Sequence, residues 1–214
     1  MRLEHFIVGP IETNAWLVAD DAAGEALVVD PGGEVDEIVA SIRRLKCSLR
    51  WIVNTHGHGD HIAGNAALKE LFPQAQLAVH EADAPMLTSA DLNLSAAFGF
   101  GVVSPEADRL LRDGDEIAVG GIAFKVIHLP GHTPGGIGLY AAPCAATDGR
   151  PLLLSGDALF AGSVGRSDFP GGSHEQLISA IRTRLLVLPP ETVVCPGHGP
   201  QTTIGEEAKT NPFL

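Results

Sequence analysis

The chain has 214 residues, of which 45% are hydrophobic, enough for one domain with a buried core. Its formal net charge of −12 argues against a nucleic-acid partner, which requires a basic face to replace phosphate counterions. No apolar run reaches the roughly 18 residues of a membrane-spanning helix, and the first residues do not open into a signal-peptide stretch. We therefore expect a soluble, cytoplasmic protein with no membrane partner.

Runs of branched residues, separated by Gly, Pro and Asp turns, predict a series of buried strands. In chain order, these predicted strands are 15–19, 26–29, 51–54, 76–79, 122–129, 137–140, 151–154 and 192–195. Residues 35–46 and 174–188 space their apolar residues as one face of a helix, and a further helix can begin within 62–72. Ser173, with Gln176 three residues on, has the pattern of a capping box.

No linker or low-complexity tract divides the chain, so residues 1–214 are expected to form a single domain. Many strands with surface helices suggest sheets packed between helix layers. The segment 81–112 differs, because it has little periodicity yet carries many apolar residues. Such a connection is either buried as core or forms a wall over a site.

The densest group of metal-binding residue types lies at 56–61, His-Gly-His-Gly-Asp-His, directly after a predicted strand. In extended backbone, residues two apart point to the same side, so His56 and His58 can converge on one ion. Asp60 and His61 follow around the turn. The intervening glycines allow the backbone to fold tightly around ions.

Three further strand ends each carry one imidazole or carboxylate beside a glycine, namely His132, Asp157 and His198. Together the seven residues supply five nitrogen and two oxygen ligands, a set that suits zinc, iron or manganese better than calcium or magnesium. A single histidine is more often an ordinary surface or core residue. Three histidines and an aspartate within six glycine-rich residues indicate a metal site instead. The three cysteines show no metal-binding or disulfide spacing.

The pattern His-x-His-x-Asp-His, followed by an isolated His, an Asp and a final His, resembles the metallo-β-lactamase superfamily. Within it, residues 156–168, Gly-Asp-Ala-Leu-Phe-Ala-Gly-Ser-Val-Gly-Arg-Ser-Asp, look like the short glyoxalase II-type hydrolases, also called hydroxyacylglutathione hydrolases. The resemblance runs from 29–33 to 211–213, nearly the full chain. It implies an α/β fold, a four-layer αββα sandwich, with the site at one edge of the two sheets.

The resemblance also implies two divalent metal ions, zinc first, with iron or manganese as alternatives. The implied ligands are His56, His58 and His132 for the first ion, Asp60, His61 and His198 for the second, and Asp157 as the bridge. Asp30 resembles a residue that orients a ligand imidazole. An Asp before Pro-Gly is also an ordinary turn residue, so both interpretations stay open.

Two metal ions can lower the pKa of a shared water, which would then attack a carbonyl as a metal-bridging hydroxide, oriented by Asp60. No obvious general acid accompanies the seven ligands. A thiol has a pKa of about 8.5 and can leave without prior protonation, so a thioester such as S-lactoylglutathione fits as substrate.

Arg166 aligns with a basic residue that contacts glutathione in the longer glyoxalase II enzymes, where it could pair with a carboxylate. An ion pair with Asp168 is the alternative. Only residues 199–214 follow the last ligand, so the helical extension that grips glutathione in those enzymes is missing.

Two other functions stay open from the sequence. A mononuclear-iron persulfide dioxygenase of the same superfamily would use the site of His56, His58 and His132; the chain resembles those enzymes at 165–169 and departs from them at 159–163. A lactonase or another ester hydrolase would differ in the segment 81–112. A non-catalytic zinc protein is disfavoured, because structural zinc sites are closed and four-coordinate. An exposed apolar loop would be compatible with a homodimer.

Overall fold

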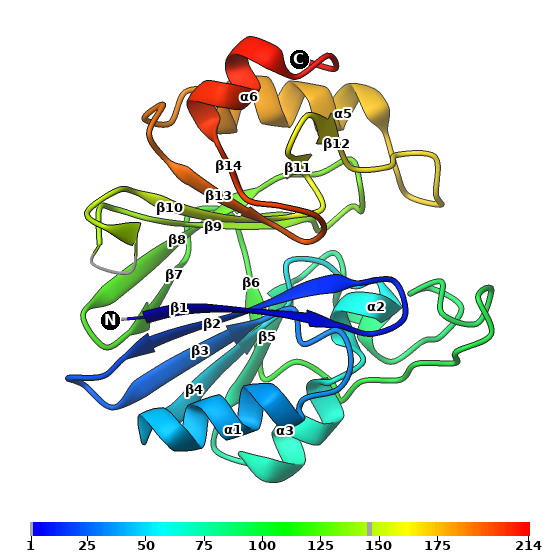
Figure 1. Ribbon diagram of the computed structural model, residues 1–214. Coiled ribbons are helices and arrows are strands. Elements are labelled where there is room, and N and C mark those ends of the chain that lie inside the picture. The colour runs from blue at the N-terminus through cyan, green and yellow to red at the C-terminus, as the bar shows by residue number, and fades with distance from the viewer. Residues whose placement is uncertain (1, 145–146) are drawn as a thin grey trace.

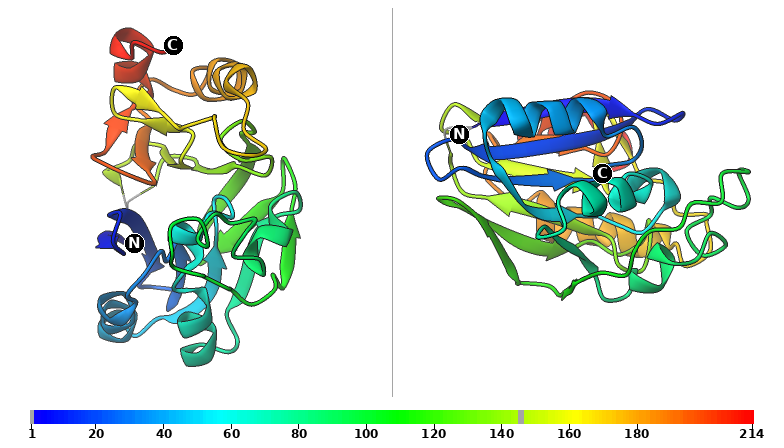
Figure 2. Two further views of the ribbon diagram at one scale, coloured as in Figure 1. Left: turned by 90° about the vertical axis from the view of Figure 1, so that its right-hand side faces the viewer. Right: turned by 90° about the horizontal axis from the view of Figure 1, so that it is seen from below.

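The computed structural model of the protein describes residues 2–144 and 147–214 (Figure 1). Within these residues, two six-stranded sheets pack face to face, and helices cover both outer faces. The left view in Figure 2 shows the same layers from another side. This is the expected α/β architecture, the αββα sandwich.

The first sheet has the order β1-β2-β3-β4-β5-β6. Its strands are β1 (Arg2–Val8), β2 (Thr13–Asp20), β3 (Glu25–Val29), β4 (Ser48–Val53), β5 (Gln76–His80) and β6 (Arg109–Leu111). Helices α1 (Asp36–Leu45) and α3 (Asn65–Leu71) cover its outer face (Figure 1). Two short helices, α2 (Gly59–Ile62) and α4 (Ala84–Leu87), lie in its connections.

The second sheet has the order β14-β13-β10-β9-β8-β7. Its strands are β7 (Glu116–Val119), β8 (Ile122–His128), β9 (Ile137–Ala141), β10 (Leu152–Gly156), β13 (Val193–Pro196) and β14 (Thr202–Thr203). A small hairpin joins β11 (Leu159–Phe160) to β12 (Ser163–Val164). The outer face carries α5 (His174–Ala180), the π-helical turn η2 (Ile181–Leu185) and α6 (Ile204–Thr210).

The alternation of side chains along a strand explains why the middle of β2 is a continuous apolar run. Trp16 and Val18 point into the core between the two sheets, while Leu17 and Ala19 point into the core under the helices. All four are buried, so β2 is covered on both faces. The sheets therefore form the rigid centre of the molecule, and the loops at the strand ends carry the polar residues.

Each of the eight strands predicted from the sequence is present. The helix expected within 62–72 is divided into α2 and α3 at Gly64, whose N–H donates to the Pro31 carbonyl (2.6 Å). A Cβ at this glycine would lie 2.5 Å from that oxygen, so the close approach requires glycine. The predicted cap is present, since the Ser173 hydroxyl accepts from the Gln176 N–H (3.3 Å).

The segment 81–112 combines the two alternatives that the sequence left open. Its base is core, because Leu87 is fully buried and Val102 packs on the cluster beneath the first sheet. Its tip, around Phe98 and Phe100, is exposed. Figure 2 (right) shows this green segment near residue 100 projecting from one end of the molecule.

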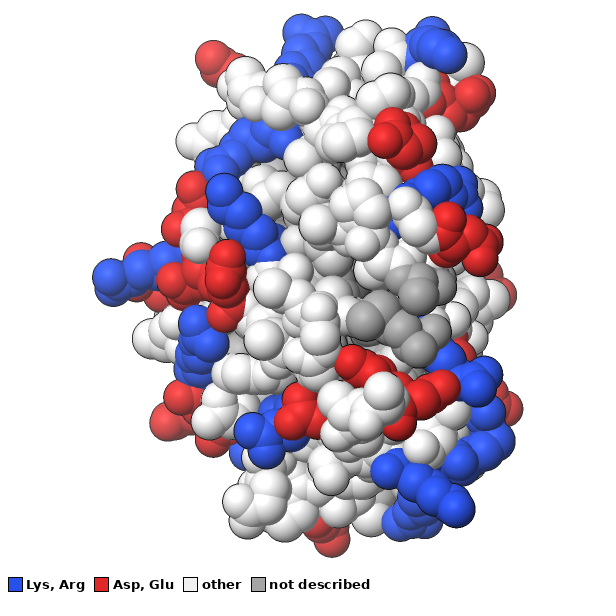
Figure 3. All heavy atoms as spheres, turned by 90° about the vertical axis from the view of Figure 1, so that its left-hand side faces the viewer, with Lys and Arg blue, Asp and Glu red and all other residues white. Residues whose placement is uncertain are grey.

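None of the helices in the described part of the chain is long and apolar enough to span a membrane. On the face that Figure 3 shows, Lys and Arg side chains lie among Asp and Glu side chains, around an uncharged central band. Charges of both signs are thus interspersed on this face.

Candidate metal centre

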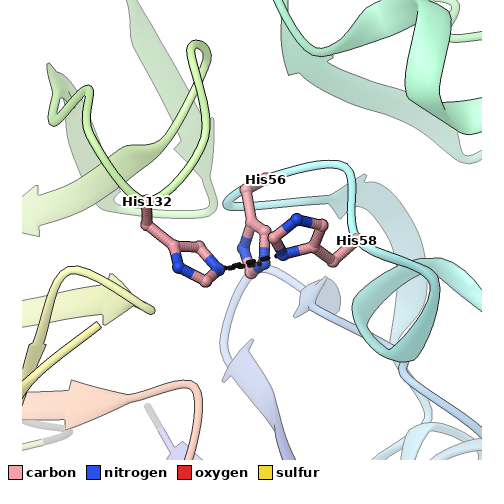
Figure 4. A group of neighbouring side chains, drawn as sticks. All are labelled: His56, His58 and His132. Carbon is pink, nitrogen blue, oxygen red and sulfur yellow. Dashed lines mark hydrogen bonds between the residues drawn. The ribbon is translucent and has the colours of Figure 1, made fainter. Parts of the chain in front are cut away.

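Three histidines from two separate loops form the first group of possible ligands (Figure 4). His56 and His58 follow β4, and His132 follows β8. The His58 Nδ1 atom lies 2.9 Å from His132 Nε2, which lies 3.2 Å from His56 Nε2. All three side chains are buried. Three converging imidazole nitrogens are a suitable donor set for a divalent transition metal.

The second group consists of Asp60, His61 and His198. The Asp60 Oδ2 atom lies 3.3 Å from His61 Nε2 and 3.3 Å from His198 Nε2. Asp60 and His61 belong to α2, whereas His198 follows β13 at the opposite sheet. Residues from both sheets therefore meet at the same end of the sandwich.

Asp157 lies between the two groups. Its Oδ1 atom is 3.4 Å from His61 Nε2, and its Oδ2 atom is 3.6 Å from both His132 Nε2 and His198 Nε2. The carboxylate thus faces histidines of both groups, and its Oδ2 atom alone lies near one histidine of each group. The structure brings all seven sequence-predicted ligands together.

Unpaired polar atoms in the site fit a bound metal. Among the described residues, His61 Nε2 and Asp157 Oδ1 are buried without a hydrogen-bond partner. Leaving such atoms unpaired away from water is costly. A Cβ at Gly197 would lie 2.1 Å from Asp157 Oδ1, so the backbone is packed against this carboxylate. The donor set and its unpaired atoms fit divalent metal ions.

The electrostatics around His56 and His58 favour neutral imidazoles. Burial and the neighbouring His61 and His132 imidazoles lower the pKa of His56 well below its usual value. Burial and His132 lower the pKa of His58 to about 3. Neutral imidazoles keep a nitrogen lone pair free for a metal.

The second group is more strongly charged. Burial lowers the pKa of His61, but the Asp60, Asp157 and Asp30 carboxylates raise it by more, so it lies well above its usual value. Burial raises the pKa of Asp60, but His61 and His198 lower it by more. In the metal-free protein, an imidazolium thus compensates the carboxylates, and a metal ion would replace its proton.

Further contacts hold the ligand rings in place. The Nδ1 of His132 donates to the Arg166 carbonyl (2.7 Å), which leaves its Nε2 facing the site. The Asp30 Oδ2 atom lies 3.1 Å from His61 Nδ1 and accepts from the Thr55 hydroxyl (2.6 Å). Asp30 is therefore more than a turn residue. Such outer contacts fix the tautomer and orientation of ligand imidazoles.

A cavity of about 510 Å³ opens beside the cluster. It is lined by ligands of both groups, by the turn between β1 and β2, by the tip of the segment 81–112 and by the β11–β12 region. Arg166 also lines it, so the residue expected to bind substrate does face the site. Its guanidinium pairs with Asp168 (2.8 Å) and lies over the Phe169 ring (4.2 Å to the ring centre).

Other histidines lie outside the cluster. His80 stacks on His128, with 4.2 Å between ring centres, and neither lines the cavity. One functional candidate was missed by the sequence interpretation. Asp83, which is fully buried, accepts hydrogen bonds from both loops that carry the first three histidines. An aspartate after a strand looks like a turn residue in sequence, so only the three-dimensional contacts reveal it.

An αββα sandwich with a His/Asp cluster at one end defines a metal-dependent hydrolase. A family profile described as the Metallo-beta-lactamase superfamily matches residues 8–198, so the chain belongs to that superfamily. Among curated relatives, it is 37% identical to hydroxyacylglutathione hydrolase GloC of Haemophilus influenzae, over 100% of this chain and 98% of the relative.

Solved structures agree with this assignment. The BLEG-1 B3 metallo-beta-lactamase matches with a TM-score of 0.90 and 35% identity, covering 99% of both chains. TTHA1623 in a di-iron-bound form matches with a TM-score of 0.85 and 38% identity, covering 99% of this chain and 100% of the other. ETHE1 from Myxococcus xanthus matches at 0.81 and 29% identity, covering 99% and 84%.

Proposed function

We propose that this protein hydrolyses thioesters, with S-lactoylglutathione as the representative substrate, using two divalent ions held by the seven clustered residues. One observation carries the proposal: two ligand groups face a shared carboxylate, Asp157, at the wall of a cavity. Outside the ligand cluster, no described side chain that lines this cavity is suited to protonate a leaving group. Zinc is proposed first. The di-iron-bound form of TTHA1623 supports iron as the alternative.

When bound, a pair of divalent ions lowers the pKa of a shared water towards neutrality and stabilises negative charge on a carbonyl oxygen. The chain supplies the geometry. Asp60 accepts a hydrogen bond from the Thr13 hydroxyl (3.1 Å), which restricts rotation of its carboxylate. The buried walls around His56 and His61 exclude bulk water from the ligand nitrogens.

The protonation state of the cavity wall favours a leaving group that departs as an anion. Outside the ligand cluster, Glu34 and Arg166 are the titratable side chains among the described residues that line the cavity. Backbone N–H groups, including that of Gly9, lower the pKa of Glu34, so its carboxyl is ionised at neutral pH. Neither residue can donate a proton readily. A thiolate needs none, because the pKa of a thiol is about 8.5.

Glutathione is a plausible thiol for two reasons. The exposed ion pair of Arg166 with Asp168 is worth little in water, so a substrate carboxylate can replace Asp168 as the partner of the guanidinium. The GloC relative is matched over 98% of its length, so it has about the same length as this chain. A relative named hydroxyacylglutathione hydrolase over this length supports a glutathione thioester as the substrate.

The alternative is a mononuclear-iron persulfide dioxygenase. The group of His56, His58 and His132 alone offers three nitrogen ligands for one iron ion. The similarities to ETHE1 and to a di-iron-bound protein are as compatible with this alternative as with a hydrolase. Metal stoichiometry and oxygen uptake distinguish the two.

The experiment measures thiol release from S-lactoylglutathione by protein of known metal content, with oxygen uptake on glutathione persulfide measured in parallel. A chromogenic cephalosporin serves as a third substrate, because of the similarity to BLEG-1. We expect thioester hydrolysis with about two metals per chain and no oxygen uptake.

Two histidine variants make a matched pair. His61→Ala removes a buried cluster residue and should abolish hydrolysis, whereas His174→Ala changes a histidine at the start of α5, outside the cluster, and should not. Oxygen uptake with one iron per chain would replace the proposal by the dioxygenase. Cleavage of the cephalosporin without cleavage of the thioester would show that the substrate is a lactam and contradict the proposed thioester hydrolysis.

A further inference from the structure

The cavity beside the cluster has an aromatic wall that the hydrolytic chemistry does not require. Its members come from the segment 81–112 and are apolar. They are Leu94, Phe98, Phe100 and Val102. Phe98 is 61% exposed and Phe100 58% exposed, so two large apolar side chains border the cavity while still facing water. Such exposed apolar surface next to a site marks a binding surface.

Hydrogen bonds fix this aromatic wall to the metal-binding loop. The Asn93 carbonyl accepts from the Gly59 N–H (2.9 Å), immediately before Asp60. The Asn93 side-chain amide donates to the Met86 and Val102 carbonyls (3.1 and 2.9 Å). The base of the wall is therefore held at a defined distance from the cluster.

The region around Arg166 is different in character. It offers a guanidinium and the Phe169 ring beneath it, where a charged thiol such as glutathione can bind. The same cavity thus offers a substrate both a basic residue and exposed aromatic side chains.

We propose that the aromatic wall binds an apolar acyl group, so that the preferred substrates are thioesters of medium-length or aromatic acids. This inference rests on the proposed thioester hydrolysis. Each methylene group buried against an apolar wall is expected to raise kcat/KM about fourfold. The lactoyl group is short and carries a hydroxyl, so contact with the wall would raise kcat/KM little for lactoylglutathione.

The test compares lactoyl-, butanoyl- and hexanoylglutathione, which share one thiol. Hexanoyl has two more methylene groups than butanoyl, so we expect kcat/KM to rise by roughly fifteenfold between them. The double variant Phe98→Ser/Phe100→Ser should remove most of this selectivity. Val103→Ser is the matched control, because Val103 is 60% exposed on the same segment but does not line the cavity. It should keep the wild-type selectivity.

The outcomes separate the two proposals. Hydrolysis of all three thioesters without chain-length dependence would overturn the acyl-binding wall and leave the hydrolase intact. Equal selectivity in wild type and double variant would also overturn it. Failure of the metal-loaded protein to cleave any of the thioesters would overturn the proposed function together with the inference.

A second inference rests on a different observation, the buried carboxylate of Asp83. Its Oδ2 atom accepts from the Gly57 N–H (3.0 Å) and from the Thr133 hydroxyl (2.7 Å). Its Oδ1 atom accepts from the Gly135 N–H (2.6 Å). The side chain is fully buried, so water cannot substitute for these bonds.

The donors belong to the two loops that carry the three-histidine group. Gly57 lies between His56 and His58, while Thr133 directly follows His132. A Cβ at Gly135 would lie 2.6 Å from Asp83 Oδ1, so the loop packs directly on the carboxylate. We infer that Asp83 is a positioning residue that joins these two loops and thereby sets the spacing of the three imidazoles.

An amide cannot replace this carboxylate without loss. Three donors meet two acceptor oxygens, and asparagine would turn one oxygen into an NH₂ group facing an N–H or hydroxyl donor. Asp83→Asn should therefore lower the affinity for one metal ion by 10- to 100-fold and leave the other nearly unchanged. Asp108→Asn is the matched control, since Asp108 also accepts a backbone N–H, from Leu77, but is exposed.

Metal affinity is measured by chelator competition, and the visible spectrum of the cobalt-loaded protein reports ligand geometry. We expect an altered spectrum for Asp83→Asn and a smaller change in the same direction for Thr133→Val, which removes one bond of the three. A purely structural role would lower stability without altering the spectrum. Wild-type affinity and spectrum in both folded variants would overturn the inference.

Discussion

Replacing Asp30 by asparagine tests how the second ligand group is oriented. Asp30 is 1% exposed, and its carboxylate accepts from the Thr55 N–H (2.7 Å) and the Thr55 hydroxyl (2.6 Å) while lying 3.1 Å from His61 Nδ1. Its backbone φ is 51°, a left-handed conformation that asparagine adopts as readily as aspartate. The substitution therefore changes the carboxylate to an amide and adds little backbone strain.

The expected loss of metal affinity in Asp30→Asn follows from the contacts of Asp30. With its amide oxygen towards the Thr55 N–H, the new side chain presents an NH₂ group to His61 Nδ1, which loses its anionic partner. A charge-assisted hydrogen bond is worth about 1.5–3 kcal/mol. Loss of an outer contact to a ligand imidazole lowers metal affinity about 10- to 100-fold, which corresponds to about 1.4–2.7 kcal/mol. The two estimates agree.

The assay titrates metal-free protein against a competing chelator and resolves the two dissociation constants. Asp30→Asn should weaken one ion by 10- to 100-fold. Thr55→Val serves as the control, because it removes the hydroxyl but keeps the carboxylate beside His61; its effect should stay below about tenfold. If both ions bind folded Asp30→Asn with wild-type affinity, Asp30 does not orient His61 and the reasoning fails.

Three further predictions concern other parts of the molecule. Asp157→Ala should abolish two-metal binding, and retention of two tightly held ions in elemental analysis would contradict the bridging role. Burial and the neighbouring His128 lower the pKa of His80 in the folded state, so the unfolded state binds a proton first as the pH falls. Its contribution to stability is therefore present above about pH 6.5 and is lost as the pH falls below that value. His80→Gln should show a smaller loss of unfolding free energy between pH 7.5 and 5 in urea titrations than wild type; an equal loss would refute this. Phe124→Ala empties a fully buried position between the sheets and should cost about 3–5 kcal/mol, whereas a loss below about 1 kcal/mol would show that the core repacks.

The buried strands could be predicted because their residues are apolar on both faces. The edges of the sheets could not. β1 is an edge strand paired with β2, and exposed, partly buried and buried positions are mixed along it, so it lacks the continuous apolar run that marks a central strand. The break at Gly64 depends on the Pro31 carbonyl, more than thirty residues away in the chain, which no local pattern contains.

The ligand cluster could be predicted because a metal requires several imidazoles and carboxylates at neighbouring strand ends, and clustered histidines are rare in turns. The residues that support it are ordinary by comparison. Asp83 is defined by three donors that meet it in space, and the aromatic wall by the cavity it borders. Neither Asp83 nor the aromatic wall has a characteristic spacing in the sequence, so both can be recognised only in the folded structure.

The most direct test of a two-metal hydrolase is a titration of metal-free protein with zinc while thiol release from an acyl-glutathione is followed. Because Asp157 faces both ligand groups, the account predicts little activity with the first equivalent and a steep rise with the second. Full activity at one equivalent, with no change on adding a second, would contradict it.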